Sequence, residues 1–271
     1  MLNAMGAEFN AVGSDVLDIT DRKAVFELLR TQKPDILINC AAYTNVDEAE
    51  NPKSANDAVN YQGVKNLAEA CAETETLLVH YSTDYVFCGN LTDQNSYPNG
   101  YSEDAPLSPV NAYGRSKLKG EQAIRDSGVR HLILRISWLC SALGNNFLKT
   151  MLRASTSGQQ LKVVSDQIGS PAFTFDVVDF TCKLINLEQT GTFHIQCDET
   201  ISWYEFAEMI FREAGIDVDL TPVNSDEWPV KAKRPAFSKL DTRKLKHVAE
   251  INEIPVTEGI RRVLNEPGIL N

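Results

Sequence analysis

The alternation of short apolar runs with helix-like segments constrains the fold of this chain more than any other feature. Strands are expected near Glu8–Val12, Asp35–Cys40, Thr76–Tyr81, His131–Ser137, Lys162–Val164 and Thr192–Gln196. Amphipathic helices are expected at Asp21–Thr31 with Thr20 as N-cap, at Lys53–Glu73 and at Ala112–Asp126. Apolar strands that alternate with helices indicate a parallel sheet covered on both faces. The predicted class is therefore α/β, with a doubly wound, Rossmann-like sheet whose ligands bind at the carboxyl ends of its strands.

The length of 271 residues suits one large α/β domain with a smaller lobe. We expect residues 1–138 and about 160–197 to form the dinucleotide-binding domain, and about 139–159 and 198–271 to form a substrate-binding lobe. Within that lobe, Ser202 and Glu205 have the spacing of a capping box, which predicts a helix that ends at Gly215.

Composition narrows the function classes. The net charge of −11 argues against nucleic acid and anionic membranes as partners. No apolar run approaches the length of a membrane span, and the first residues do not have the pattern of a signal peptide. The 6 cysteines form no CxxC pair and the 4 histidines are dispersed. Reduced thiols, a cytoplasmic location and no metal site are the resulting expectations.

A tyrosine and a lysine at the start of one predicted helix indicate acid-base chemistry. Tyr113 and Lys117 are four residues apart, so they lie on the same helix face. An ammonium near the phenol favours the phenolate, and we therefore expect Lys117 to lower the pKa of Tyr113. Thr83, at the end of the strand before this helix, is expected to supply a hydroxyl to the same substrate oxygen.

The same spacing occurs once more, at Tyr61 and Lys65, so spacing alone is weak evidence. We interpret that second pair as part of an ordinary amphipathic helix. Only Tyr113 follows a buried strand that ends in Ser82 and Thr83, and Pro109 provides the loop before its helix.

The chain contains no glycine-rich turn of the kind that lets a backbone approach a pyrophosphate. MLNAM followed by Gly6 is interpreted as the end of a helix with a glycine cap. We therefore expect the sequence to begin inside the first βαβ unit and to lack a central strand between those at Glu8 and Thr76. Three explanations stay open: a true start further upstream, a degenerate relative, or a site that works without this turn.

Several motifs taken together resemble one family. DILINCAAYTNVDEAE, VHYSTDYVF, SPVNAYGRSKLKGE, RISWL, NNFLKTML, VVSDQIGSP and KRPAFSKLD resemble the dTDP-4-dehydrorhamnose reductases, which belong to the extended short-chain dehydrogenase/reductases. The resemblance covers nearly the whole chain from Asp15 onward. It implies NADPH- or NADH-dependent reduction of the 4-keto group of dTDP-4-dehydro-L-rhamnose by a cytoplasmic enzyme. A homodimer is one expectation for its assembly, and the oligomeric state stays open.

The resemblance also implies roles for individual residues. Tyr113 would donate the proton. Lys117 would lower the pKa of Tyr113 and hold the nicotinamide ribose, and Thr83 would bind the substrate oxygen. The remaining cofactor contacts implied are Asp18, Ile19, Ala41, Ala42, Tyr43 and Asn60, and the substrate contacts Ser82, Trp138 and Arg234, the last facing the diphosphate. Cys88 stands where the family often has Asp, and the loop Gly89–Gly100 is longer than usual, which affects the expected substrate fit.

Residue types alone leave plainer roles open for some of these positions. Asp18 suits a turn before Thr20, Trp138 suits a core, and Arg234 suits a solvated loop. Two functions also stay open: an active reductase, favoured by the intact Thr83, Tyr113 and Lys117, and a catalytically silent binding or regulatory relative, favoured by the absent glycine turn.

Overall fold

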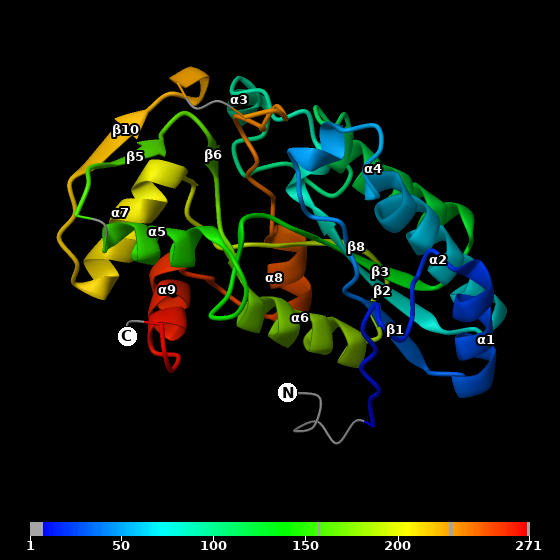
Figure 1. Cartoon of the computed structure of the whole chain (residues 1–271). Helices are drawn as coiled ribbons and strands as arrows, with labels where there is room; N and C mark the ends of the chain where they lie inside the picture. Colours follow the sequence, from blue (N-terminus) through cyan, green and yellow to red (C-terminus); the bar gives the residue numbers. More distant parts are fainter. Residues whose placement is uncertain (1–7, 157, 228–229, 270–271) are drawn as a thin grey trace.

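The computed structural model describes residues 8–156, 158–227 and 230–269. Its centre is a four-stranded parallel sheet in the order β1-β2-β3-β8 (Figure 1). These strands span Ile36–Asn39, Leu77–Thr83, His131–Ile136 and Gly191–Ile195. The predicted parallel α/β sheet is confirmed.

Helices cover both faces of this sheet, because its buried strands carry apolar side chains on both sides. On one face Leu78 and Ile133 pack against α1 (Arg22–Gln32), α2 (Val64–Glu73) and α4 (Ala112–Asp126). On the other face Leu77, Val79 and Leu132 join a core that includes α6 (Thr174–Asn186) and α8 (Arg243–Ala249). The sheet thus lies between two layers of helices (Figure 1).

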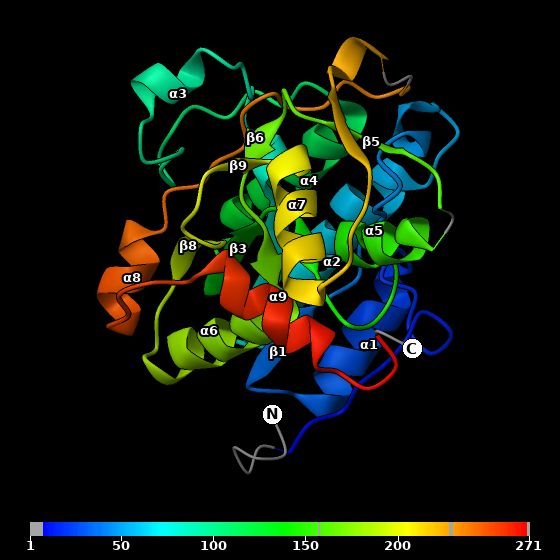
Figure 2. The same cartoon turned by 90° about the vertical axis from the view of Figure 1, so that its left-hand side faces the viewer.

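A smaller lobe packs beside the carboxyl ends of the strands, and Figure 2 shows it facing the viewer. Its helices are α5 (Phe147–Ser155), α7 (Trp203–Ala214) and α9 (Val256–Leu264). Its short strands are β4 (Leu139–Cys140), β5 (Leu161–Val164), β6 (Ile168–Gly169), β7 (Ala172–Phe173), β9 (Ile201–Ser202) and β10 (Leu220–Val223). The pairs are β10-β5 and β4-β7, both parallel, and β6-β9, antiparallel.

Short helical segments lie in the connections. They are η2 (Glu48–Glu50), the π-helical η3 (Ala58–Gly63), η4 (Asp84–Val86), α3 (Asp93–Ser96) and η5 (Ser225–Glu227). The predicted capping box is confirmed: Ser202 and Glu205 cap α7, which ends at Gly215 in the left-handed conformation. Because β5 pairs with β10, the strand predicted at Lys162–Val164 belongs to the smaller lobe and not to the central sheet.

Several local predictions are wrong. Residues 8–12 form no strand and are exposed, because no neighbouring strand in the described chain pairs with them. The place beside the Thr76 strand, where a missing strand is expected, is taken by β1, which pairs directly with β2. Asp21, not Thr20, caps α1 by accepting from the Ala24 N–H at 3.1 Å. The MLNAM helix prediction lies outside the described residues.

The helix predicted from Lys53 begins at Asn56 instead. The side chain of Asn51 accepts the Lys53 N–H at 3.0 Å, and this local turn satisfies the backbone in a non-helical conformation. No helix in the described part of the chain is long and apolar enough to cross a bilayer.

Candidate active site

The start of α4 places Tyr113 and Lys117. Asn111 is its N-cap and accepts the Gly114 N–H at 2.8 Å. A Cβ at Gly114 would lie 2.2 Å from the Tyr85 carbonyl oxygen, so only glycine lets α4 approach η4 this closely. The close approach brings Tyr113 to the carboxyl end of β2, where ligands of parallel sheets bind.

The phenol of Tyr113 lies near the hydroxyl of Thr83, because the start of α4 approaches the end of β2. Burial raises the pKa of Tyr113 to about 12, and the hydrogen bond with Thr83 opposes this rise. The expected lowering of the Tyr113 pKa by Lys117 is wrong for this structure, because the lysine ammonium is turned to other partners. The ring of Tyr85 packs edge-on against Tyr113, with 5.8 Å between centroids.

Lys117 reaches back to the middle of β2. Its Nζ donates to the Tyr81 carbonyl oxygen at 2.6 Å and lies 3.3 Å from His80 Nε2. The side chain is almost completely buried, and burial lowers its pKa to about 8, against the opposing effect of Glu121. The ammonium therefore titrates much nearer to neutral pH than an ordinary lysine does.

Asp84 is a site residue that the sequence predictions missed. Its Oδ1 accepts from the Thr83 hydroxyl at 3.0 Å, while its Oδ2 is buried and has no hydrogen-bond partner among the described residues. Burial raises the pKa of Asp84 to about 7, although hydrogen bonds from Thr83 and Ser238 lower it. The available signal was its position directly after Thr83, where a strand end presents polar groups.

Ser82 points away from this group, since neighbouring residues of a strand face opposite sides of a sheet. Its hydroxyl donates to Glu121 Oε1 at 2.6 Å. Glu121 in turn forms a fully buried ion pair with Arg135 at 2.8 Å, and these partners hold the Glu121 pKa at about 2. The Ser82 hydroxyl, which is predicted to contact the substrate, is therefore engaged in a hydrogen bond within the protein.

The residues after β1 form an open turn. Ala41 and Ala42 are exposed, and the Tyr43 N–H donates to Asn60 Oδ1 at 2.9 Å. Asn60 is completely buried in the π-helical η3 and also donates to the Tyr43 carbonyl oxygen at 2.9 Å. Asn60 therefore fixes the turn from behind, and the small side chains leave room for a ligand along the backbone.

The two remaining candidate cofactor contacts have clear local roles. Asp18 accepts from the Thr20 N–H and hydroxyl at 2.9 and 2.8 Å, and these bonds lower its pKa. Ile19 packs in the core formed by α1 and α2, and its carbonyl oxygen accepts from Asn66 at 3.0 Å. These contacts agree with plainer roles for both residues: Asp18 as a turn residue and Ile19 as a core residue.

Trp138 and Arg234 both engage protein partners. Trp138 stacks on Trp203 of α7 with 3.6 Å between ring centroids, and its φ of 43° is left-handed. Arg234 donates to Asp47 Oδ2 at 2.9 Å. Asp47 Oδ1 also accepts the Lys231 and Ala232 N–H groups at 3.1 and 2.9 Å, so this carboxylate joins η2 to the loop before Pro235.

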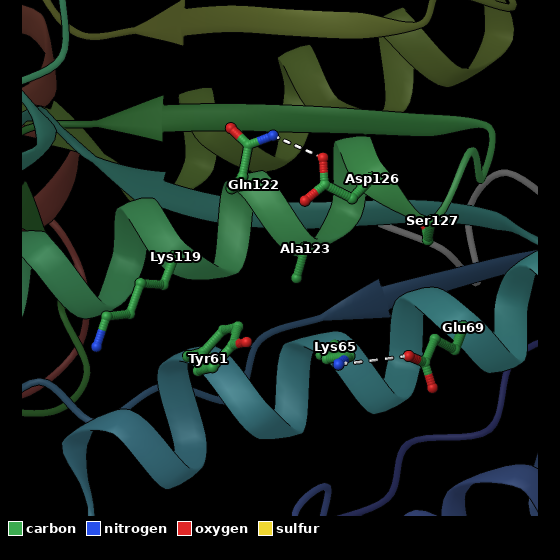
Figure 3. Close-up of a pocket in the computed structure, with 8 residues that line it drawn as sticks. All are labelled: Tyr61, Lys65, Glu69, Lys119, Gln122, Ala123, Asp126 and Ser127. Carbon is green, nitrogen blue, oxygen red and sulfur yellow. Dashed lines mark hydrogen bonds and ion pairs between the residues drawn. The ribbon is translucent and has the colours of Figure 1, made fainter.

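The second tyrosine-lysine pair lies at a different place, in a cavity of about 400 Å³ between α2 and α4 (Figure 3). Lys65 is 3.9 Å from Glu69, and Lys119 lies over the Tyr61 ring at 5.8 Å. The cavity is lined by residues on the outer sides of these helices and contains none of the residues around Thr83. Its interpretation as an ordinary helix surface is consistent with these contacts.

A doubly wound parallel sheet with a helix-borne tyrosine and lysine beside a strand-end threonine is the arrangement of the extended short-chain dehydrogenase/reductases, a class of nicotinamide-dependent oxidoreductases. The family model described as "RmlD substrate binding domain" matches residues 1–268. The chain belongs to this family, which the resemblance to the dTDP-4-dehydrorhamnose reductases predicts.

Relatives of similar sequence and structure agree with this assignment. The dTDP-4-dehydrorhamnose reductase of Salmonella typhimurium is 37% identical over 92% of this chain and 85% of its own length. The spore coat polysaccharide biosynthesis protein SpsK of Bacillus subtilis is 36% identical over 98% of this chain and 91% of its own length. The dTDP-4-dehydrorhamnose reductase of Bacillus anthracis, solved in complex with NADP, has 36% identity and a TM-score of 0.90 over 97% of this chain and 92% of its own.

Proposed function

We propose that this protein reduces the 4-keto group of a nucleotide sugar with NADPH or NADH, converting dTDP-4-dehydro-L-rhamnose to dTDP-L-rhamnose. The observation that carries the proposal is the placement of the Tyr113 phenol, at the start of α4, beside Thr83 and Tyr85 at the carboxyl end of β2. The NADP-bound relative and the reductases of similar sequence support the cofactor and substrate class.

The nicotinamide cofactor, when bound, supplies a hydride to the carbonyl carbon. The exposed turn Ala41–Tyr43, which Asn60 holds from behind, suits the cofactor because it offers open backbone at the end of β1. Asp18, Ile19 and Lys117 are further proposed contacts, with Lys117 at the ribose.

Residues of the protein stabilise the negative charge that develops on the substrate oxygen. Tyr113 donates its phenolic proton to this oxygen, and Thr83 donates a hydrogen bond to it. In the structure the Thr83 proton is directed at Asp84. A protonated Asp84 can donate to Thr83 instead, which leaves the threonine proton for the substrate. The raised Asp84 pKa keeps this protonated form available near neutral pH.

Trp138, which stacks on α7 of the smaller lobe, and Arg234 are proposed as substrate contacts, at the sugar and the diphosphate respectively. Arg234 binds anions through a planar fork, and its ion pair with Asp47 holds that fork beside the site. Ser82 acts indirectly, because its hydroxyl is bonded to Glu121.

The test compares Tyr113→Phe with Tyr61→Phe, since Tyr61 has the same spacing to a lysine but lies on the outer helix surface. With dTDP-4-dehydro-L-rhamnose and NADPH, Tyr113→Phe should lose roughly 10²–10⁴-fold in kcat, the usual contribution of a general acid. The Kd of Tyr113→Phe for NADPH should stay close to that of the unchanged protein. Tyr61→Phe should be as active as the unchanged protein. Equal activity in the two variants refutes the role of Tyr113.

A binding measurement distinguishes an active reductase from a catalytically silent relative. NADPH fluorescence should increase when the cofactor binds this chain. Absence of both binding and turnover in the native protein would favour a silent binding or regulatory subunit.

A further inference from the structure

Three polar side chains form a continuous buried row across β1, β2 and α4. Asn39 Nδ2 lies 3.1 Å from His80 Nδ1, and His80 Nε2 lies 3.3 Å from Lys117 Nζ. Each of the three residues is at most 4% exposed. Since buried polar groups need hydrogen-bond partners, the proton positions along this row can be deduced by counting hydrogen-bond donors and acceptors.

The amide of Asn39 has its orientation fixed from outside the row. Its Oδ1 accepts the Ala41 N–H at 3.0 Å, so its NH₂ group must face His80. His80 Nδ1 then accepts this hydrogen bond. A neutral imidazole that accepts at Nδ1 carries its proton on Nε2, and that proton points at Lys117.

A charged Lys117 conflicts with this arrangement. An ammonium has three donors and no acceptor, so it cannot accept from His80 Nε2–H. The neutral amine can accept, while it still donates to the Tyr81 carbonyl oxygen at 2.6 Å. Protonation of Lys117 therefore requires the other imidazole tautomer, which turns a donor toward the donor of Asn39.

We propose that Asn39 and His80 are positioning residues for Lys117, and that the tautomer of His80 follows the charge of this lysine. Protonation of Lys117 then costs the hydrogen bond between Asn39 and His80. This inference rests on the proposed function, in which Lys117 contacts the nicotinamide ribose.

The surrounding groups are consistent with a single titrating member of the row. Burial, then the neighbouring Lys117, lowers the His80 pKa well below its ordinary value, so the imidazole stays neutral. Glu121 faces both residues and favours their charged forms. The Glu121 carboxylate is itself held by Arg135 of β3 and by Ser82 of β2. Within this row, Lys117 is the member that titrates nearest to neutral pH.

The direct test is the ring ¹⁵N spectrum of the histidine-labelled full chain over a range of pH. His80 is assigned with His80→Gln. We expect the proton on Nδ1 when Lys117 is charged and on Nε2 when Lys117 is neutral, with the change near pH 8. The change should be absent in Lys117→Met. His131, whose ring contacts the Val129 carbonyl oxygen at 2.8 Å, is the internal reference. A His80 tautomer that does not change with pH overturns the proposal.

The kinetic test uses Asn39→Asp and Asn39→Leu. Both remove the donor that faces His80, so both should raise the pH at which kcat/KM falls on the alkaline side by about one pH unit. A shift in Asn39→Asp alone would show that added charge is responsible, and would overturn the donor argument. The NMR experiment needs neither variant of Asn39 and no turnover, so failure of the reductase assignment would be recognised separately.

Discussion

At the scale of single residues, the carboxyl group of Asp84 has the clearest dependence on pH. It is buried beside Thr83, and its pKa is raised from 3.8 to about 7. A carboxyl whose pKa is raised by folding stabilises the folded state below its ordinary pKa, and this contribution is lost as pH rises through the folded pKa. The difference corresponds to on the order of 4 kcal/mol.

Asp84→Asn should therefore become more stable relative to the unchanged protein as pH rises from about 4 to about 8. The amide cannot ionise, so it avoids the cost of a buried carboxylate. Urea unfolding of both proteins across this pH range gives the two free energies of unfolding. Parallel pH profiles for the two proteins would contradict a raised Asp84 pKa.

At the scale of elements, the packing of α4 against η3 depends on Gly120. A Cβ at this position would lie 2.3 Å from the Asn60 carbonyl oxygen. This contact also explains how Asn60, which holds the turn after β1, comes to lie against the helix that carries Tyr113. A single close helix contact thus connects the cofactor side of the site to its proton donor.

Gly120→Ala should consequently destabilise the protein by about 1–3 kcal/mol, the range for overpacking. In an open helix the same change would stabilise by about 0.5–1 kcal/mol, so the sign of the effect is diagnostic. Gln122→Ala, at an exposed position of the same helix, should change stability by less than about 0.5 kcal/mol. Thermal unfolding measures both, and a gain in stability for Gly120→Ala would refute the close packing.

At the scale of the whole molecule, Asp47 connects the sheet domain to the smaller lobe. Its carboxylate accepts from two backbone N–H groups and from Arg234. Hydrogen bonds and Arg234 together hold the Asp47 pKa below its ordinary value, against the effect of burial. The loop that contains Arg234 is thereby attached to η2 beside the site.

Asp47→Ala should raise the KM for the nucleotide sugar several-fold, about tenfold at most, because Arg234 loses its orienting partner. The Kd for NADPH should change by less than about twofold, since the Asp47 side-chain hydrogen bonds in the described part of the chain are to Lys231, Ala232 and Arg234, none of them a proposed cofactor contact. Asp57→Ala, which removes the exposed ion pair with Lys119, is the control. Parallel losses of cofactor and sugar binding would indicate general unfolding instead.

The elements with local signals are predictable from the amino-acid sequence. The helix Ala112–Asp126, the capping box at Ser202 and the parallel strand pattern follow from side-chain periodicity and end-group chemistry, which act within a few residues. The facing of Tyr113 and Thr83 also followed, because strand ends and the helix start meet at one edge of such a sheet.

The other features depend on contacts between segments that are distant in the sequence. The region Glu8–Val12 has strand-like residues but no partner strand in the described chain, and a strand forms only where its backbone is paired. Burial sets the protonation of Asp84, Tyr113 and Lys117, and burial depends on segments distant in sequence. The row from Asn39 to Lys117 exists for the same reason: it joins two strands and a helix that only the folded sheet brings together.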